Sequence, residues 1–198
     1  MPNPKRFDRE DVTQKAKELF WRQGYHATSM RDLSAELDMR PASIYAEFGN
    51  KDGIFIEAIT AYQNEMELRF HQALDSTDCG LDALRTFIQS VSIGNQHQAA
   101  RACMLAKTLL EIEDHEHRAR QAAQAYIESF QGALCGLINS IQDAGEIDRS
   151  LAPNDVATFV QVQLMGLRSA SQMGLSNEQL QHQLDWCMAS IATLTHCE

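Results

Sequence analysis

The stretch "SMRDLSAELDMRPASIYAEFGNK" (29–51) contains two short helix patterns separated by a tight turn at residues 38–40. Ser29 suits the capping position of the first helix, and Asp32 stands three residues later, as in a capping box. Pro41 is favoured at the first position of the second helix, because its missing N–H would have no partner there. The apolar residues of both helices are able to meet over the preceding helix, so the stretch predicts a helix-turn-helix.

Helical periodicity continues on both sides of this stretch, and strand signals are almost absent. Asp8 suits the cap of a helix before it, and Asn50 the cap of a long helix after it. Five further helices are predicted from apolar positions at helical spacing, within residues 81–91, 105–112, 119–141, 156–167 and 180–194. We therefore expect an all-α fold of about nine helices, with a three-helix N-terminal domain and a larger C-terminal helical domain.

Composition places the chain among ordinary globular proteins, with 198 residues, 44% apolar and 22% charged. No apolar run approaches the roughly 18 uncharged residues of a membrane span, and the N-terminus lacks the apolar segment of a signal peptide. The five cysteines are an odd number, widely spread and without a Cys-x-x-Cys pair. We therefore expect a cytoplasmic protein with reduced thiols rather than a disulfide framework or a zinc site.

The formal charge of −10 is unevenly distributed. Residues 1–51 contain nine Lys and Arg against eight Asp and Glu, a net charge of +1, so the remaining residues carry −11. A locally basic N-terminal part on an acidic body allows phosphate contact at one end, while the body repels DNA.

The stretch "GYHATSMRDLSAELDMRPASIYAEFGNKDGIFIEAI" (24–59) resembles the N-terminal signature of the TetR family of bacterial transcriptional regulators. The resemblance implies a helix-turn-helix DNA-binding domain at 1–52 and a helical effector-binding and dimerisation domain at 53–198. It implies a ligand-responsive DNA-binding regulator, a repressor that a small apolar or electrophilic effector releases from its operator. The expected partners are double-stranded operator DNA, a second copy of the chain and an effector of unknown identity, with no membrane and no cofactor.

The resemblance also assigns DNA contacts, with Tyr45 and Lys51 touching phosphates. A lysine beside the free N–H groups of a helix N-terminus suits a phosphate. Small residues on the outer face of the second helix allow it to lie deep in the major groove, where alanine can meet a thymine methyl group. The expected DNA-binding set is Thr28, Ser29, Arg40, Pro41, Ala42, Ser43, Tyr45, Ala46 and Lys51.

Two residues depart from the family pattern. Asp38 stands where the family usually has glycine in the turn, and aspartate tolerates a left-handed backbone better than most residues. Glu47 lies where many relatives carry a neutral or basic residue. It is suited either to accept from a cytosine amino group or to face solvent, and the sequence does not decide between these.

The resemblance implies that the last two helices form a four-helix homodimer interface. The residues expected there are Val156, Phe159, Val160, Leu167, Leu184, Met188 and Ile191. The fourth to seventh helices are expected to enclose an effector, with Tyr62, Met66, Phe70, Phe87, Cys103, Met104, Leu109, Tyr126 and Phe130 as candidates. Each effector candidate is equally well suited to the core of a single chain, and intrachain core is the alternative for the dimer set.

The segment "ARACMLAKTLLEIED" (100–114) resembles one from a family branch in which some members sense electrophiles or oxidants through the cysteine. Arg101 and a helix N-terminus would lower the pKa of Cys103 and favour its thiolate. A buried, inert thiol is the alternative. The nearby His115 and His117 would point about 200° apart on a helix and could share one ion only if the segment is a loop, so we expect no metal site there.

Two other classes of function remain open from the residues themselves. One is a helical enzyme or small-molecule carrier without DNA binding, and the other is an adaptor whose N-terminal part binds protein. The sequence contains no phosphate loop, nucleophile elbow or convincing pairing of histidine with carboxylate. We therefore expect that the chain is not an enzyme.

Overall fold

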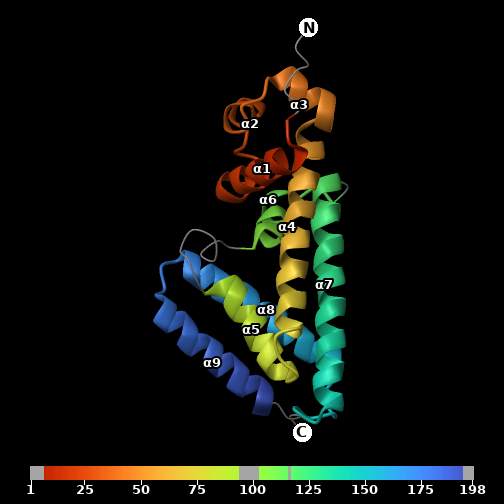
Figure 1. Cartoon of the computed structure of the whole chain (residues 1–198), viewed down its shortest axis with the longest axis vertical. Helices are drawn as coiled ribbons and strands as arrows, with labels where there is room; N and C mark the ends of the chain where they lie inside the picture. The colour runs from red at the N-terminus through yellow and green to blue at the C-terminus, as the bar shows by residue number, and fades with distance from the viewer. Residues whose placement is uncertain (1–6, 94–102, 116, 194–198) are drawn as a thin grey trace. The chain divides into compact units, whose positions relative to one another are not determined.

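The computed structural model describes residues 7–93, 103–115 and 117–193, which form nine α-helices and no strand (Figure 1). The helices are α1 (Arg9–Gln23), α2 (Met30–Glu36), α3 (Pro41–Phe48), α4 (Lys51–Leu74), α5 (Gly80–Ser92), α6 (Met104–Glu111), α7 (Arg118–Asp143), α8 (Pro153–Gln172) and α9 (Asn177–Thr193). The predicted all-α fold with an N-terminal helix-turn-helix is confirmed.

The predicted helix caps form hydrogen bonds. The Asp8 carboxylate accepts from the N–H of Glu10 at 2.9 Å at the start of α1. Ser29 and Asp32 form a reciprocal capping box on α2. The Asn50 side chain accepts from the N–H of Gly53 at 2.8 Å at the start of α4. These bonds define the ends of the N-terminal helices because each satisfies an N–H that has no partner within its helix.

The chain divides into two compact units, and the division falls within α4 and again within α7. The head unit comprises residues 1–65 and 104–125, and the body unit comprises residues 66–103 and 126–198. This division describes compactness, whereas the boundary expected after Asp52 describes function and stays a prediction.

The head unit is built around α1. Leu19, Leu33 and Ile44 from α1, α2 and α3 are almost completely buried. The rings of Phe20 and Phe55 meet edge to face at 4.6 Å between centroids and attach α1 to α4. These contacts leave the opposite side of α3 exposed.

Glu111, the last residue of α6, attaches that helix to the turn after α1. Its carboxylate accepts from the N–H of Tyr25 at 2.7 Å, and its carbonyl oxygen lies 2.9 Å from His26 Nε2. Gly24 begins this turn with φ of 93°, and a Cβ there would collide with the Glu111 carboxylate. The positive φ favours glycine at this position, and a larger residue would also displace the Glu111 carboxylate.

In the body unit, α5 packs against α8 and α9. Leu84, Ile88, Val160, Leu184 and Ile191 are fully buried between these helices. A second group consists of the rings of Phe70, Phe87 and Phe130, which meet with centroids 5.1–5.9 Å apart.

Candidate nucleic-acid interface

The exposed face of α3 combines small side chains with one tyrosine. Ala42, Ser43 and Ala46 are exposed, and the Tyr45 side chain remains 49% exposed although it is a large aromatic group. Ile44 and Phe48 face the interior of the head unit. One side of α3 therefore packs against the head unit and the other side is exposed. The short side chains on the exposed side allow close approach to another surface.

The turn before α3 has the left-handed conformation that the sequence allowed. Asp38 has φ of 50°, and it is the only non-glycine residue with positive φ among the described residues. Ser34 secures the turn, because its carbonyl accepts from the N–H of Met39 at 3.2 Å and its hydroxyl donates to the Met39 carbonyl at 2.5 Å. This turn places Arg40 as the exposed N-cap of α3.

Lys51 begins α4 and lies against Tyr25. Its ammonium nitrogen is 4.2 Å from the centre of the Tyr25 ring, and the Tyr25 hydroxyl donates to the Asp52 carboxylate. Burial lowers the pKa of Lys51, although Asp52 and Glu111 act in the opposite direction. The pKa of Tyr25 is raised, first by burial and then by the hydrogen bond to Asp52. The lysine is thus held in place by an aromatic face near the N-terminus of a helix.

The two hydroxyl residues before α2 differ in exposure. Ser29 is exposed and its hydroxyl is 2.6 Å from the Asp32 carboxylate. Thr28 is fully buried, and its hydroxyl donates to the Gly24 carbonyl at 2.6 Å. The Thr28 hydroxyl therefore stabilises the turn between α1 and α2, a role that the sequence pattern did not indicate.

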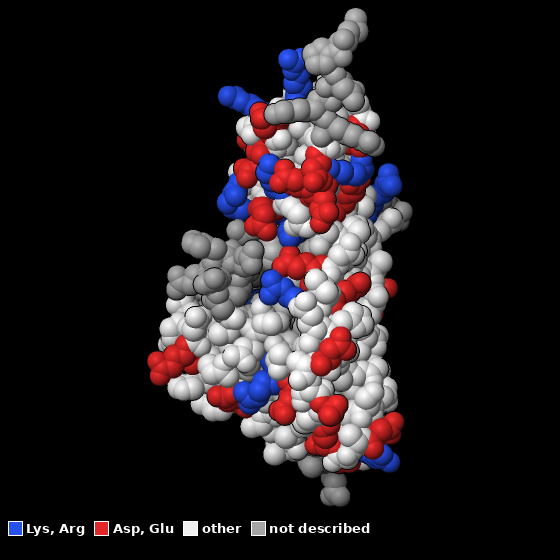
Figure 2. Space-filling view, in the orientation of Figure 1, with Lys and Arg blue, Asp and Glu red and all other residues white. Residues whose placement is uncertain are grey.

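Glu47, whose role the sequence left open, forms an ion pair with Arg9 of α1. Arg9 also pairs with Glu57 of α4. Sequence reasoning missed Arg9, because nothing in its local pattern indicates a partner 38 residues away. On the face shown in Figure 2, most Lys and Arg atoms lie over the N-terminal helices, interleaved with acidic side chains.

The expected dimer residues lie largely inside the chain. Six of the seven are buried within the single chain, and Phe159 is half-buried. The buried six are Val156, Val160, Leu167, Leu184, Met188 and Ile191. They were expected at the interface because the resemblance places the last two helices there and these residues are apolar, but α5 packs on both helices in the same chain.

The outer sides of α8 and α9 carry different residues. Val162 is 59% exposed, Met173 is 76% exposed and Trp186 is 67% exposed. The exposed residues three and four positions from Val162 and Trp186 include no Asp, Glu, Lys or Arg, and they are Thr158, Gly166, His182, Gln183, Ala189 and Ser190. Sequence reasoning missed Trp186, although a tryptophan among polar residues of α9 was an available signal.

The expected effector residues fall in both units and are mostly buried. In the head unit, Tyr62 and Met104 are buried and Leu109 is half-buried. The remaining residues belong to the body unit. Met66, Phe70, Phe87 and Tyr126 are buried there, and Cys103 and Phe130 are half-buried.

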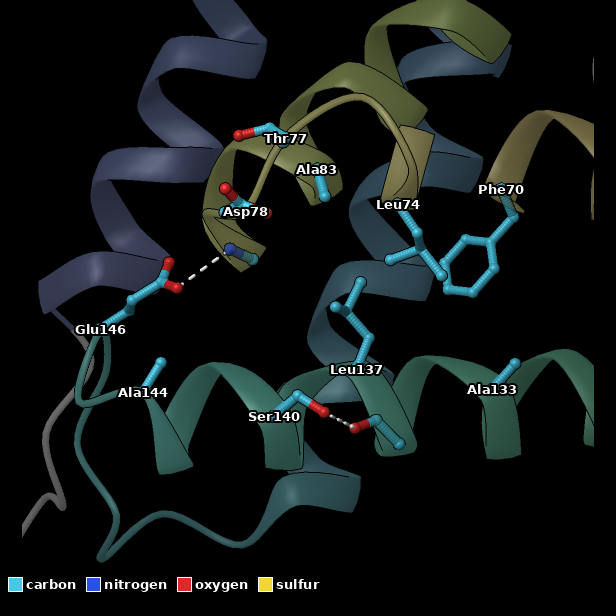
Figure 3. Close-up of a pocket in the computed structure, with 12 residues that line it drawn as sticks. Phe70, Leu74, Thr77, Asp78, Ala83, Ala133, Leu137, Ser140, Ala144 and Glu146 are labelled. Atoms are coloured by element: carbon cyan, nitrogen blue, oxygen red, sulfur yellow. Dashed lines mark hydrogen bonds between the residues drawn. The ribbon is translucent and has the colours of Figure 1, made fainter. Parts of the chain in front are cut away.

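A hollow of about 410 Å³ lies in the body unit among α4, α5 and α7. Phe70, Leu74 and Leu137 form its apolar side, and α7 contributes small residues such as Ala133 and Ser140 (Figure 3). Of the expected effector residues, Phe70 lines this hollow. Its size is within the range of small-molecule sites, and its walls are mainly apolar.

Cys103 immediately precedes α6 and is half-buried. Arg101, which was expected to lower its pKa, lies outside the described residues, so that expectation stays a prediction. Within the described ranges, no three His, Cys, Asp or Glu side chains gather in a way that could hold a metal ion. Within the same ranges, no helix has the length and apolar character needed to span a membrane.

An exposed short helix, supported by two others through buried side chains and preceded by a tight turn, is the arrangement that enters the DNA major groove in helix-turn-helix proteins. A lysine at the next helix start and an exposed tyrosine suit the flanking phosphates. The fold and the site together define a DNA-binding protein of the helix-turn-helix class.

Family models identify the group within this class. A model of the bacterial regulatory proteins of the tetR family matches residues 12–58, and a model of a tetracyclin repressor-like C-terminal domain matches residues 80–185. The second match alone spans more than half of the chain. The chain therefore belongs to the TetR family, and it is a DNA-binding transcriptional regulator.

Curated relatives share this description. The chain is 25% identical over 185 residues to the HTH-type transcriptional repressor ComR of Escherichia coli (strain K12), covering 89% of this chain and 85% of ComR. It is 26% identical over 178 residues to the HTH-type transcriptional repressor BdcR of the same organism, with the same coverage of 89% and 85%.

Solved structures have the same fold. The TetR family regulator CifR, as a cysteine mutant in complex with 26 bp double-strand operator DNA, gives a TM-score of 0.85 at 22% identity and covers 95% of this chain and 99% of CifR. The reduced form of Escherichia coli NemR gives a TM-score of 0.80 at 17% identity, covering 95% and 98%.

Proposed function

We propose that this regulator is a repressor that binds operator DNA as a homodimer and releases it when a small molecule binds. The observation that carries the DNA contact is the exposed face of α3, where small residues and Tyr45 are presented between Arg40 and Lys51. ComR and BdcR are transcriptional repressors, and the CifR structure contains operator DNA. These relatives support repression and operator binding by this chain.

The proposed interface has a centre and a rim. Ala42, Ser43 and Ala46 would face base edges, since short side chains allow the helix to lie deep in the groove. The residues proposed to contact or flank the phosphates are Ser29, Arg40, Pro41, Tyr45 and Lys51. Thr28 is left out of this interface, because its hydroxyl is buried and already donates to the Gly24 carbonyl.

The proposed homodimer uses the outer sides of α8 and α9. Val162 and Trp186 are large and exposed, and the exposed positions three and four residues from each carry no Asp, Glu, Lys or Arg. The cores of interfaces are depleted of charged residues. Two copies would present two α3 helices to half-sites related by twofold symmetry. A homodimer is therefore suited to recognise a palindromic operator.

The proposed effector is a small apolar or electrophilic molecule. The apolar hollow beside Phe70 supports an apolar ligand, and the half-buried thiol of Cys103 supports an electrophile. Coupling of about 1–3 kcal/mol would change DNA affinity about 5–150-fold. If the effector acts on the thiol, a quinone should release the wild-type protein from operator DNA but leave a Cys103→Ser variant bound. Release of both proteins by the quinone would reject the thiol mechanism.

The same proposal includes a cytoplasmic location for the protein, and it assigns the protein no catalytic role. The family consists of regulatory proteins, and a repressor must reach chromosomal DNA. The described residues offer no observation that favours an enzyme over a regulator.

The test of DNA binding replaces Tyr45 and Lys51 by alanine, one at a time. Each variant is expected to lose affinity for operator DNA, and Lys51→Ala should also reduce the salt slope by about one, because one phosphate contact is lost. The measurement is fluorescence anisotropy with a duplex that the wild-type protein selects from a random library.

Lys15→Ala is the control, since Lys15 is an exposed α1 lysine that pairs with Asp11. It removes the same charge without touching α3 or the start of α4. If Tyr45→Ala and Lys51→Ala bind as well as Lys15→Ala, the assignment of these residues is wrong. If the wild-type protein selects no sequence, the proposed function itself is wrong.

A further inference from the structure

The guanidinium of Arg9 joins α1 to two other helices. Its Nε donates to Glu57 of α4 at 3.2 Å, and its terminal nitrogens donate to Glu57 and to Glu47 of α3. The guanidinium carbon also lies 4.9 Å from the centre of the Phe48 ring in α3. One side chain therefore connects the end of α3 to α4 by two carboxylates and an aromatic face.

Glu47 lies in an unfavourable place for a carboxylate. It stands in the last turn of α3, where the helix dipole disfavours negative charge. It is four residues after Ser43 and so lies on the same flank of the helix, next to the face proposed to read bases. Neither the stability of α3 nor attraction to phosphate accounts for this residue, whereas the contact with Arg9 does.

The contribution of this cluster to folding is expected to be small. The Arg9 and Glu47 side chains are 48% and 36% exposed, and exposed ion pairs stabilise proteins little. The cluster is expected to matter more for DNA affinity than for folding, because without Arg9 the Glu47 carboxylate would face the phosphates. Such a charge would cancel about one phosphate contact, which is worth about tenfold in affinity near 0.1 M salt.

We propose that Arg9 is a positioning residue for DNA recognition. It neutralises Glu47, so that the small-residue face of α3 approaches DNA without repulsion. Arg9 acts through Glu47 rather than by its own contact with phosphate. The inference rests on the proposed DNA binding and assigns a role to a residue outside the recognition helix.

The test compares Arg9→Gln, Glu47→Gln and the double variant with a matched control. The control is Arg22→Gln, because Arg22 also starts from α1, pairs with Glu36 at 3.0 Å and has the same exposure, 50% and 35% for the two side chains. That pair joins α1 to α2 and does not touch α3. Affinity and salt slope are measured by fluorescence anisotropy with a duplex that the wild-type protein selects from a random library.

Arg9→Gln is expected to weaken binding about tenfold, because it leaves Glu47 uncompensated. Glu47→Gln alone should remain within about threefold of wild type, since it removes the carboxylate beside the recognition face. Arg22→Gln should do the same, because the carboxylate that it leaves unpaired, Glu36, belongs to α2 and not to α3. The double variant should recover most of the lost affinity and keep the salt slope of the wild type. Circular dichroism of each variant verifies that it is folded.

Two outcomes would overturn the inference while the proposed function stands. In the first, Arg9→Gln binds like Arg22→Gln. In the second, the double variant stays as weak as Arg9→Gln and its salt slope is lower by about one, which would make Arg9 a direct phosphate contact. A wild-type protein that selects no duplex would overturn the proposed function and the inference together.

Discussion

At the scale of single residues, Asp38 shows how the turn before the recognition helix tolerates a departure from glycine. Its φ of 50° is in the left-handed region, where a side chain costs about 1–2 kcal/mol for most residues and less for aspartate. The two hydrogen bonds between Ser34 and Met39 hold the turn in this conformation. The backbone on either side therefore imposes the strained value.

Replacing Asp38 by glycine tests this strain. Asp38→Gly is expected to raise the free energy of unfolding by up to about 1 kcal/mol, because the left-handed cost disappears and only part of it is offset by the greater freedom of the unfolded chain. Asp38→Val should lower it, since a β-branched residue tolerates this region least. Urea denaturation measures both, and equal stabilities for the glycine and valine variants would contradict the assignment.

Tyr25 and Lys51 form the second residue-scale prediction. Tyr25→Leu removes the ring below the ammonium, a contact worth about 0.5–1 kcal/mol, so DNA affinity should fall about two- to fivefold. Tyr25→Phe keeps the ring and loses only the bond to Asp52, and its affinity should stay near that of the wild type. Fluorescence anisotropy with operator DNA separates the two, and equal losses would attribute the effect to the hydroxyl.

At the scale of helices, α5 is capped from a distant part of the chain. Its N-cap residue Cys79 forms no side-chain cap, and the Glu146 carboxylate (Figure 3) instead accepts from the N–H of Gly80 at 2.9 Å. The same carboxylate accepts from the N–H of Leu81 at 2.8 Å. A Cβ at Gly80 would collide with Ile141, so glycine allows this close approach. Burial raises the pKa of Glu146, but these N–H donors and the Cys79 thiol outweigh it and hold the pKa below its ordinary value.

Glu146→Gln is expected to lower the free energy of unfolding by about 1 kcal/mol at pH 7, as for other capping losses. Because the folded pKa lies below the unfolded one, the carboxylate stabilises the fold above the unfolded pKa, and this contribution is lost as the pH falls through the folded pKa. The difference in free energy of unfolding between the variant and the wild type should therefore become smaller as the pH falls below about 4.3. Urea denaturation across this range measures it.

Glu113→Gln is the control for the glutamate variant, because Glu113 is exposed and lies outside the helices. It should leave both the stability and its pH dependence nearly unchanged. If the free energies of unfolding of Glu146→Gln and the wild type differ by the same amount at all pH values, the charge of Glu146 does not stabilise α5.

At the scale of the whole molecule, the outer sides of α8 and α9 set the proposed oligomeric state. Trp186→Asp is expected to raise the dimer dissociation constant by at least about thirtyfold, since a buried interface tryptophan typically contributes 2 kcal/mol or more. Operator affinity should fall with it, because the two α3 helices are no longer joined. Sedimentation velocity measures the dimer, and anisotropy measures DNA binding.

Leu110→Asp is the matched control, because Leu110 is 83% exposed and lies on α6 rather than on α8 or α9. It introduces the same charge at an exposed apolar position. If Trp186→Asp remains as dimeric as Leu110→Asp, the proposed interface is wrong.

The helices and the site elements of the head unit were predictable because their signals are local. Asp8, Ser29 and Asn50 cap N–H groups only two or three residues away, so each cap can be recognised from a few letters. Pro41 and the alternation of buried Ile44 and Phe48 with exposed residues define α3 in the same way. The resemblance to one family then indicated which side of α3 faces DNA.

The dimer surface was not predictable from local apolar patterns. Val160 and Leu184 lie on strong apolar stripes, and such a stripe has the same appearance whether it packs in its own chain or against a second copy. Only the packing of α5 on α8 and α9 shows that these stripes are already covered. Exposed Val162 and Trp186 became candidates for that reason.

Local signals were sufficient to predict the all-α class, the two helices of the helix-turn-helix and the family, because periodicity, caps and motif spacing act over a few residues. The tertiary structure decided which charges meet and which apolar faces remain exposed. Arg9 and Glu47 are 38 residues apart, and Glu146 and Gly80 are 66 apart. Such partners are selected by the packing of whole helices, which no local pattern records.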